Sequence, residues 1–370
     1  MGKKATILAE QHRLQQTQDR SHHWRRWGPY LSERAWGTVR EDYSPYGTAW
    51  EYLPHDQARS KAYTWGEDGL GGICDNHQRL CFSLALWNGQ DPILKERLFG
   101  LSGNEGNHGE DVKESYFYLD STPTPSYMKY LYKYPQRAFP YEELVRVNRE
   151  RGRGQDEYEL ADTGAFAENR YFDVFVEYAK ADADDLLIRI IACNRGPQPA
   201  ALHLLPTLWF RNTWSQGEAE RRPSLEEAIA MEGCRAVEAQ HPDLGTRWLF
   251  LPGGVPLLFT ENETNRQRLY GQPNTTPYVK DGIERFLLHG ESGAVNHGQV
   301  GTKVAAHFCT EIPAGGEWSC CLRLMDHLPE ANPLGEKELG LIEQRRGEAD
   351  EFFAWVAGNG LSADAQNVQR

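Results

Sequence analysis

Between residues 171 and 324 the sequence is a series of short apolar runs, and no helical segments alternate with them. The runs are rich in β-branched and aromatic residues, which favours extended strands. They lie at 171–178, 186–193, 200–210, 246–251, 256–260, 303–312 and 318–324. Strands that follow one another without crossover helices pair antiparallel, and many of them build two packed sheets. The pattern therefore predicts a mainly β protein, a large antiparallel sandwich with flanking helices.

Turn signals and local patterns refine this expectation. Asn-Arg-Gly-Pro at 194–197 marks a turn, and Pro-Ala-Gly-Gly at 313–316 predicts a hairpin between the last two runs. Residues 76–86 show a helical pattern that ends before Asn-Gly at 88–89. The Tyr-rich run at 127–134 and the aromatic residues at 209–214 are expected in the core or at a domain interface.

Both ends of the chain read as helical. Residues 337–357 have a helical pattern, which Gly-Asn-Gly at 358–360 ends. Ser362 is then the expected N-cap of a second helix, with Asp364 in its first turn. We therefore expect three parts: a polar N-terminal helix over 1–27, a sandwich with inserted helices and loops over 28–328, and a helical linker over 329–370. The linker is expected to lead into a domain that this chain lacks.

The charge and hydropathy of the chain exclude several classes of partner. It carries 40 Lys and Arg against 53 Asp and Glu, a net charge of −13, whereas nucleic-acid binding needs a concentrated basic surface. No apolar run approaches the roughly 20 residues that span a bilayer, and the N-terminus has no apolar signal core. The sequence predicts a cytoplasmic protein with neither nucleic acid nor membrane as a partner.

The seven cysteines are odd in number and scattered. They are Cys74, Cys81, Cys193, Cys234, Cys309, Cys320 and Cys321. None has zinc-ligand spacing, so they are expected to be small core residues in a reducing compartment. The sequence also lacks a G-x-S-x-G elbow, a phosphate loop and a dinucleotide fingerprint. We therefore expect neither a cofactor nor a bound metal.

Residues 36–68 interleave aromatic and charged side chains, including a His-Asp pair at 55–56. The candidate sugar-binding residues here are Trp36, Arg40, Glu41, Asp42, Trp50, Trp65, Glu67 and Asp68. The rings would cover the C–H face of a sugar, and the charged groups would bind its hydroxyls. The competing interpretation is a buried network, with Arg40 paired to an acid, that fixes the sandwich against another domain. The sequence supports the two equally.

A glycine-spaced loop at 103–111 is the second candidate. Its possible sugar ligands are Asn107, His108, Glu110 and Asp111. An ordered turn in which a neighbour binds His108 explains the sequence equally well. A calcium site built on Glu110 and Asp111 is disfavoured, because the spacing matches no known calcium loop.

Several long runs resemble the N-terminal part of bacterial glycoside hydrolase family 63 proteins. They are WGTVREDYS at 36–44, WGEDG at 65–69, LWNG at 86–89, LKERLFG at 94–100, GNHGEDVKE at 106–114, LYKYP at 131–135 and LPTLWFRNTW at 205–214. That group is similar to processing α-glucosidase I and to mannosylglycerate and glucosylglycerate hydrolases. The resemblance covers nearly the whole chain.

The resemblance implies a two-domain inverting α-glycosidase. A β-supersandwich would pack against an (α/α)6 barrel, and the barrel would carry an acid and a base about 6.5–9.5 Å apart. Because the chain ends where that barrel would begin, no catalytic residue is expected in it. The implied activity is hydrolysis of glucosidic bonds in an oligosaccharide or small glycoside, with the barrel as partner domain. The alternatives are a free-standing carbohydrate-binding or assembly module and a truncated product with exposed interface aromatics.

Overall fold

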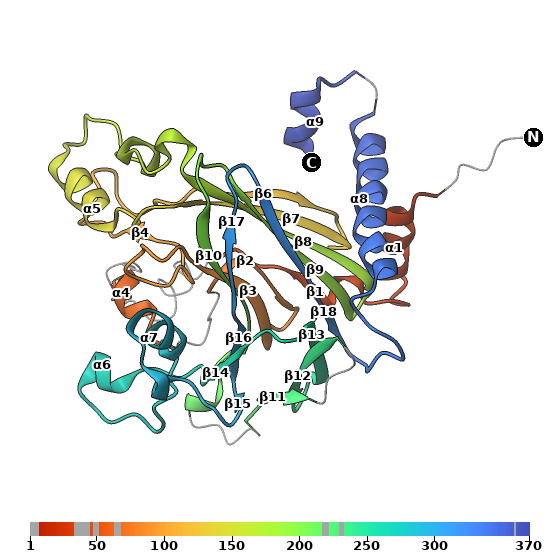
Figure 1. The fold of residues 1–370 in the computed structure, drawn as a ribbon. Helices are drawn as coiled ribbons and strands as arrows, with labels where there is room; N and C mark the ends of the chain where they lie inside the picture. Colours follow the sequence, from red (N-terminus) through yellow and green to blue (C-terminus); the bar gives the residue numbers. More distant parts are fainter. Residues whose placement is uncertain are drawn as a thin grey trace, which may run out of the picture.

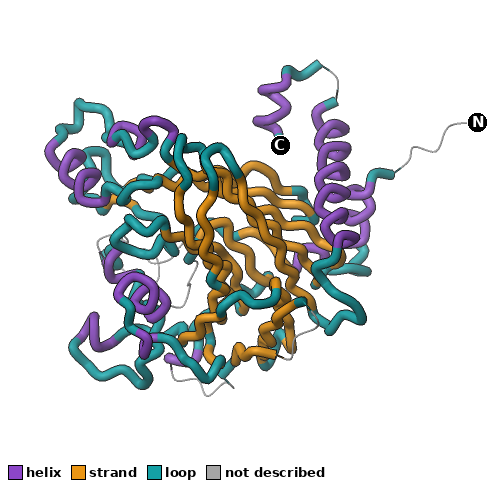
Figure 2. Tube along the Cα trace, in the orientation of Figure 1, coloured by secondary structure: helices purple, strands orange, loops and turns teal. Residues whose placement is uncertain are grey.

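The computed structural model describes residues 7–32, 45–46, 52–62, 68–216, 222–228, 233–358 and 360–370. Within these ranges the strands form a seven-stranded sheet, a nine-stranded sheet and a two-stranded hairpin, all antiparallel. The large sheets lie at the centre of the molecule, and helices lie around them (Figures 1 and 2). The prediction of a mainly β, antiparallel sandwich is confirmed.

The seven-stranded sheet is built around its long strand β10. In spatial order its strands are β1 (Trp27–Pro29), β2 (Leu70–Asp75), β3 (Leu80–Trp87), β10 (Ala200–Phe210), β16 (Lys303–Ala306) and β14 (Leu257–Thr260). The seventh strand, β17 (Phe308–Ile312), pairs with the first half of β10 beside β16. One edge of β10 therefore pairs with β3, and the other pairs with β16 and β17.

The nine-stranded sheet forms the second layer. Its order is β15 (Val300–Gly301), β11 (Ser224–Ala228), β12 (Cys234–His241), β13 (Gly245–Pro252), β18 (Glu317–Met325), β9 (Asp185–Asn194), β8 (Tyr171–Asp182), β7 (Tyr127–Pro135) and β6 (Tyr116–Ser121). The hairpin consists of β4 (Gly100–Leu101) and β5 (Asp111–Val112).

The main core lies between the two large sheets. Alternate residues of each strand face inward, since successive side chains in a strand point to opposite faces. Phe82 and Leu84 of β3 belong to the same buried cluster as Ile188 and Ile190 of β9, and all four are at most 1% exposed. Each such side chain contributes about 1.5–3 kcal/mol by its burial. Because the inner faces pack against each other, helices can pack only on the outer face of each sheet.

The helices lie outside the two sheets (Figure 1). They are α1 (Ala9–Gln18), α4 (His55–Ala58), α5 (Tyr141–Glu150), α6 (Arg266–Tyr270), α7 (Gly282–His289), α8 (Glu336–Ala357) and α9 (Ala363–Gln369). Short 3-10 helices occur at Trp24–Arg26, Leu160–Thr163, Ala167–Asn169, Trp214–Gln216 and Ser292–Ala294. α8 packs on the nine-stranded sheet through Ile342 and Ala349, and α7 packs on the seven-stranded sheet through Ile283. No helix among the described residues is long and apolar enough to cross a membrane.

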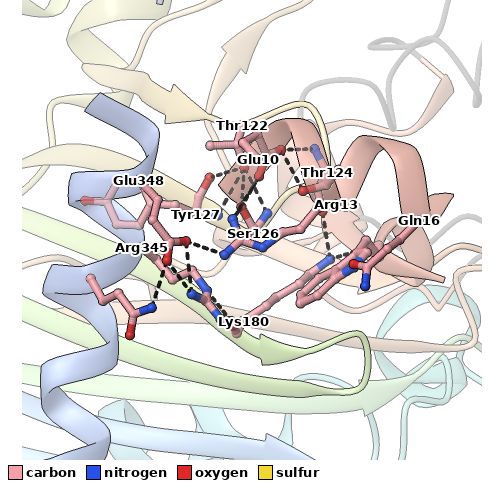
Figure 3. A network of polar contacts seen from close by, with 12 residues as sticks. Glu10, Arg13, Gln16, Thr122, Thr124, Ser126, Tyr127, Lys180, Arg345 and Glu348 are labelled. Carbon is pink, nitrogen blue, oxygen red and sulfur yellow. Dashed lines mark hydrogen bonds and ion pairs between the residues drawn. The ribbon is translucent and has the colours of Figure 1, made fainter. Parts of the chain in front are cut away.

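Buried charges fasten α1 to α8 (Figure 3). Glu10 is fully buried and accepts hydrogen bonds from Thr124 N–H at 2.8 Å and from Ser126 Oγ at 2.7 Å. Arg13 pairs with both Glu10 and Glu348 of α8. Charged side chains remain buried only when they are paired, so this network specifies how the two helices dock.

Several local predictions are confirmed. The apolar runs from residue 171 onward are strands β8, β9, β10, β13, β14, β16, β17 and β18. The terminal helix pattern corresponds to α8, and Ser362 Oγ caps α9 by accepting from Ala365 N–H. In the N-terminal region the helix spans only Ala9–Gln18, and residues 24–29 form a 3-10 turn and β1. The division into three parts at residues 27 and 328 stays a prediction.

The helix predicted at 76–86 is wrong, because this segment is a turn followed by β3. The carboxylate of Asp75 accepts hydrogen bonds from the N–H groups of His77, Arg79 and Leu80, and so closes the turn. β3 is a central strand that is buried on both faces except at its last residue. A strand of this kind has no alternation of apolar and polar residues, so its pattern resembles that of a buried helix.

The hairpin predicted at 313–316 is also wrong. β17, before the turn, pairs with β10 in the seven-stranded sheet. β18, after the turn, pairs with β9 and β13 in the nine-stranded sheet. The turn therefore carries the chain from one layer of the sandwich to the other.

Candidate functional site

Most of the cluster predicted at 36–68 lies outside the described residues. This holds for Trp36, Arg40, Glu41, Asp42, Trp50, Trp65 and Glu67. Their part in sugar binding therefore stays a prediction. Of the candidate sugar-binding residues in this segment, Asp68 is described, and it lies two residues before β2.

Asp68 belongs to a buried ion-pair network on the outer face of the seven-stranded sheet. Its Oδ1 lies 2.6 Å from Arg97 Nη1, and its Oδ2 lies 2.8 Å from Lys280 Nζ. Burial alone would raise the pKa of Asp68, but the Lys280 and Arg97 cations lower it to about 2. Lys280 also donates to the carbonyl oxygens of Ala58 and Lys61, so the ionised carboxylate helps to hold the 58–62 segment over the sheet.

The space beside Asp68 is too small for a sugar ring. Lys303 Nζ lies 2.8 Å from Glu96 Oε2, and these side chains with Trp209 surround a void of about 10 Å³. Such a void holds about one water molecule. The geometry of Asp68 fits the interpretation of a buried network better than that of a direct sugar contact.

The predicted loop at 103–111 connects β4 to β5, and its polar residues bind a neighbouring loop. Asn107 Nδ2 donates to the carbonyl oxygen of Gln155 at 2.9 Å, and His108 Nε2 lies 2.9 Å from the same oxygen. Both contacts agree with an ordered turn in which a neighbour binds His108. Glu110 is half-buried directly before β5.

A lysine lies among the acids at the base of this loop. Asp111, Glu157 and Glu159 offer carboxylate oxygens within 4.8 Å of one another. Lys113 Nζ lies 2.6, 2.6 and 2.8 Å from these three carboxylates, and its side chain is fully buried. Burial would lower the pKa of Lys113, but hydrogen bonds to the three carboxylates raise it. The ammonium group thus supplies the positive charge that a bound cation would bring.

A larger cavity lies next to α4 and has a volume of about 610 Å³. We call it the α4 cavity. It is lined by Pro54, His55, Asp56, Arg59, Ile93, Phe99, Gly100, Ser102, Glu105, Tyr141 and Glu142. Ligand sites in proteins commonly measure about 300–1,000 Å³ and combine rings with a few polar groups. The α4 cavity has both properties.

His55 is the most distinctive group in this lining. Its ring packs edge-on against Phe99, with centroids 5.3 Å apart, and stacks on Tyr141 at 5.9 Å. Burial lowers the pKa of His55 well below its ordinary value, and the Lys95 and Arg59 cations act in the same direction. The imidazole is therefore neutral near pH 7. Its Nε2 atom is buried and makes no hydrogen bond within the described part of the chain.

Acidic groups surround one arginine in the cavity wall. Arg59 donates to both carboxylate oxygens of Glu284 and, at 2.8 Å, to Asp56. Burial raises the pKa of Asp56, but its contacts with Arg268 and Arg59 dominate and lower it. Glu105 accepts a hydrogen bond from Ser102 N–H at 2.9 Å, which turns the loop toward the cavity.

Two buried charges support the aromatic wall of the cavity from behind. Lys95 Nζ lies 3.7 Å from the ring centroid of Phe139 and 4.7 Å from that of Tyr141. Tyr141 also donates from its hydroxyl to Asp91 Oδ2 at 3.2 Å. The rings are thereby held in place before any ligand binds.

The sequence indicated only part of this site. The His-Asp pair at 55–56 lies within the cluster that the sequence singled out, and Glu105 lies within the predicted loop. Arg59, Tyr141 and Glu142 carried no signal, because they come from segments far apart in the chain. None of the four candidates in the loop, Asn107, His108, Glu110 and Asp111, lines the α4 cavity.

Comparison with known proteins finds similarity to one longer protein. No protein family model matches it. A Saccharomyces cerevisiae protein, "Uncharacterized protein YMR196W", is 40% identical over 403 residues, which cover 98% of this chain and 37% of that protein. The chain thus spans little more than a third of the length of this relative.

Two solved structures show a remote similarity. A polysaccharide lyase is 11% identical with a TM-score of 0.30, and the match covers 72% of this chain and 28% of the lyase. A galactose mutarotase related enzyme from Lactobacillus acidophilus is 8% identical with a TM-score of 0.26, and the match covers 72% of this chain and 97% of that enzyme. Similarities at this level carry no argument about function.

Proposed function

We propose that this chain is the N-terminal β-sandwich part of a family 63-like inverting α-glycosidase of the α-glucosidase type. In this proposal the α4 cavity contributes sugar contacts to a pocket that a second domain completes. The observation that carries it is the lining of the cavity, where a neutral histidine, carboxylates and fixed aromatic rings face a space of about 610 Å³.

Several groups in that lining have properties that suit a sugar. The ring of Tyr141 offers an apolar surface for the C–H face, and Asp56 and Glu105 accept hydrogen bonds from hydroxyl groups. The neutral imidazole of His55 adds no further charge to the wall of the cavity. One of the runs that resemble family 63, at 94–100, contributes Phe99 and Gly100 to the lining of this cavity.

The acid and base of hydrolysis are proposed to lie outside this chain. Inversion needs one carboxylic acid with a raised pKa and one carboxylate free to activate water. Arg59 pairs with Asp56 and with Glu284, so both act here as partners of a cation. The yeast relative is long enough to hold a further domain, since this chain covers 37% of it.

Binding of methyl α-D-glucopyranoside to the chain, followed by saturation-transfer NMR, tests the cavity. We expect His55→Gln and Tyr141→Ala to weaken binding about tenfold, equivalent to about 1.4 kcal/mol. Tyr270→Ala is the matched control, because Tyr270 is 54% exposed on α6 and does not line the cavity. Equal binding by all variants would overturn the assignment of the cavity.

Hydrolysis tests the second half of the proposal. We expect residues 1–370 alone to leave 4-nitrophenyl α-D-glucopyranoside intact. Cleavage by this chain would show that the acid and base lie within it. Sugar binding by the chain, with no hydrolysis by the full-length yeast relative, would favour a carbohydrate-binding module instead.

A further inference from the structure

Three titratable side chains meet on the outer face of the seven-stranded sheet and do not line the α4 cavity. His203 lies in β10, Cys309 lies in β17, and His307 directly precedes β17. His203 and Cys309 are directly opposed partners in the register of the two antiparallel strands. Opposed residues on one face of such a pair have neighbouring Cβ atoms, so the sheet itself holds these side chains together.

The three side chains contact one another in series, from Cys309 to His203 to His307. Cys309 Sγ lies 3.7 Å from His203 Nε2, and His203 Nδ1 lies 2.8 Å from His307 Nε2. The two imidazole rings lie edge to edge and nearly parallel, with centroids 5.1 Å apart and planes at 11°. The ring of Trp87 packs against His203 at 4.8 Å. His203 is therefore held on both sides, and its Nε2 faces the thiol.

The hydrogen bond between the two histidines leaves one ring nitrogen of His203 for a ligand. When His203 Nδ1–H donates to His307 Nε2, His203 Nε2 keeps its lone pair for a ligand. A hydrogen bond to the far nitrogen is the usual way in which a metal-binding histidine is oriented.

Cys309 is exposed, whereas the other cysteines are buried or half-buried. All seven cysteines are among the described residues and are free, and Cys309 is the exposed one. The expectation that the cysteines are small core residues is therefore wrong for Cys309. Its side chain follows the outward face of β17, where alternate residues point to solvent.

The separation of the two candidate ligand atoms suits one shared ion. Zinc binds thiolate sulfur at about 2.3 Å and imidazole nitrogen at about 2.0–2.1 Å, so two ligands in a tetrahedral arrangement lie roughly 3.5 Å apart. The observed distance between Sγ and Nε2 is 3.7 Å. A shift of a few tenths of an ångström would bring both atoms into range.

We propose that Cys309 Sγ and His203 Nε2 bind a thiophilic d10 cation of the Zn²⁺ class, with His307 as the positioning residue and water in the remaining coordination positions. Binding replaces the S–H bond of Cys309 by a sulfur–metal bond and releases the proton to solvent, with no change of oxidation state. The site is independent of the proposed sugar-binding function.

Titration of the chain with Cd²⁺ under reducing conditions tests this site. Sulfur-to-cadmium charge-transfer absorption reports the thiolate contact, and competition with Zn²⁺ then measures the affinity for the lighter ion. We expect saturation at one ion per chain. Cys309→Ser should abolish the absorption, and His203→Gln should weaken the affinity by about tenfold or more.

Two matched controls give the test its specificity. Cys193→Ser removes a half-buried thiol whose neighbour is a carboxylate, and His297→Gln removes an exposed imidazole that contacts the carbonyl oxygen of Ser292. Both should bind Cd²⁺ as the unaltered chain does. His307→Phe removes the hydrogen bond to His203 Nδ1 and should weaken binding by about tenfold.

The outcomes separate clearly. An unchanged affinity in His203→Gln would overturn the site, because the thiol alone would then explain the binding. Absorption that survives Cys309→Ser and disappears in Cys193→Ser would place the ion elsewhere. Unchanged binding in His307→Phe would remove the positioning role. The thermal midpoint of each apoprotein shows whether a variant is folded.

Discussion

Lys95 Nζ lies 2.7 Å from Glu114 Oε1, and both side chains are completely buried. Glu114 also accepts a hydrogen bond from Phe99 N–H at 2.8 Å, while Lys95 faces the ring of Tyr141 at 4.7 Å. Phe99 and Tyr141 are the aromatic wall of the α4 cavity. The shape of this candidate site therefore depends on an ion pair that does not itself line the cavity.

Removing one partner of the Lys95–Glu114 ion pair should lower the stability of the folded chain. Lys95→Met leaves Glu114 as a buried charge without its cation, and such changes lower the free energy of unfolding by about 3–5 kcal/mol. Urea denaturation followed by tryptophan fluorescence measures the loss. The control is Lys129→Met, since Lys129 is 30% exposed and lies 3.7 Å from its partner Glu177, so about 0–1 kcal/mol is expected. Equal losses in the two variants would contradict this account.

The ionised state of Asp68 should make stability depend on pH. Its pKa is lowered from 3.8 to about 2 in the folded chain, so the unfolded chain binds this proton more tightly. The contribution is therefore present above about pH 4 and is lost as the pH falls toward 2, and it amounts to about 2 kcal/mol.

Asp68→Asn tests this dependence. We expect the variant to be less stable than the unaltered chain at pH 7, with a difference that shrinks as the pH falls from about 5 to about 2. Urea midpoints across this range give the comparison. A difference that stays constant with pH would show that the carboxylate charge is not responsible.

Replacing Lys113 should create a cation site. Lys113→Met leaves the carboxylates of Asp111, Glu157 and Glu159 within 4.8 Å of one another and without the ammonium group. Mutual repulsion should lower the Tm. Calcium prefers carboxylate oxygens, so millimolar Ca²⁺ should restore it.

Sodium chloride at matched ionic strength controls for simple screening in this experiment. The unaltered chain should show no shift of Tm with Ca²⁺. A Ca²⁺ response of equal size in both proteins would mean that the ion acts elsewhere.

The contact between α1 and α8 should depend on Glu10. Glu10→Ala removes a fully buried carboxylate that pairs with Arg13 and accepts bonds from Thr124 and Ser126. We expect a loss of about 3–5 kcal/mol in the free energy of unfolding. Glu150→Ala is the control, because Glu150 forms an exposed pair with Arg146 worth about 0.3–0.5 kcal/mol. Comparable losses would contradict a specific role for Glu10.

The sequence predicted the strands whose own residues favour extended structure. The apolar runs after residue 171 carry their own β propensity and turn residues, and all of them are strands. The pairing partners were not predictable in the same way. The residues from Pro313 to Gly316 are typical of a turn. Which sheet each flanking strand joins depends on pairing with distant strands, β10 for β17 and β9 for β18.

The same limit applies to the candidate site. Arg59 and its partner Glu284 are 225 residues apart, and no spacing rule connects them. The sequence singled out Asn107 and His108 as polar side chains, but it did not indicate that both contact the carbonyl oxygen of Gln155. Patterns along the chain identify polar side chains, whereas the fold decides whether they face a cavity or another loop.

The position of β10 bears on how the chain folds during synthesis. This strand is apolar and largely buried, and it needs β3 from far upstream and β16 and β17 from far downstream to cover its two edges. A nascent chain that has not yet reached residue 303 exposes one edge of β10 along its length. Unpaired apolar edges recruit other chains, and pairing over long loops is slow. The sandwich can therefore close only after β16 and β17 have been synthesised, and until then β10 is a site at which nascent chains can associate.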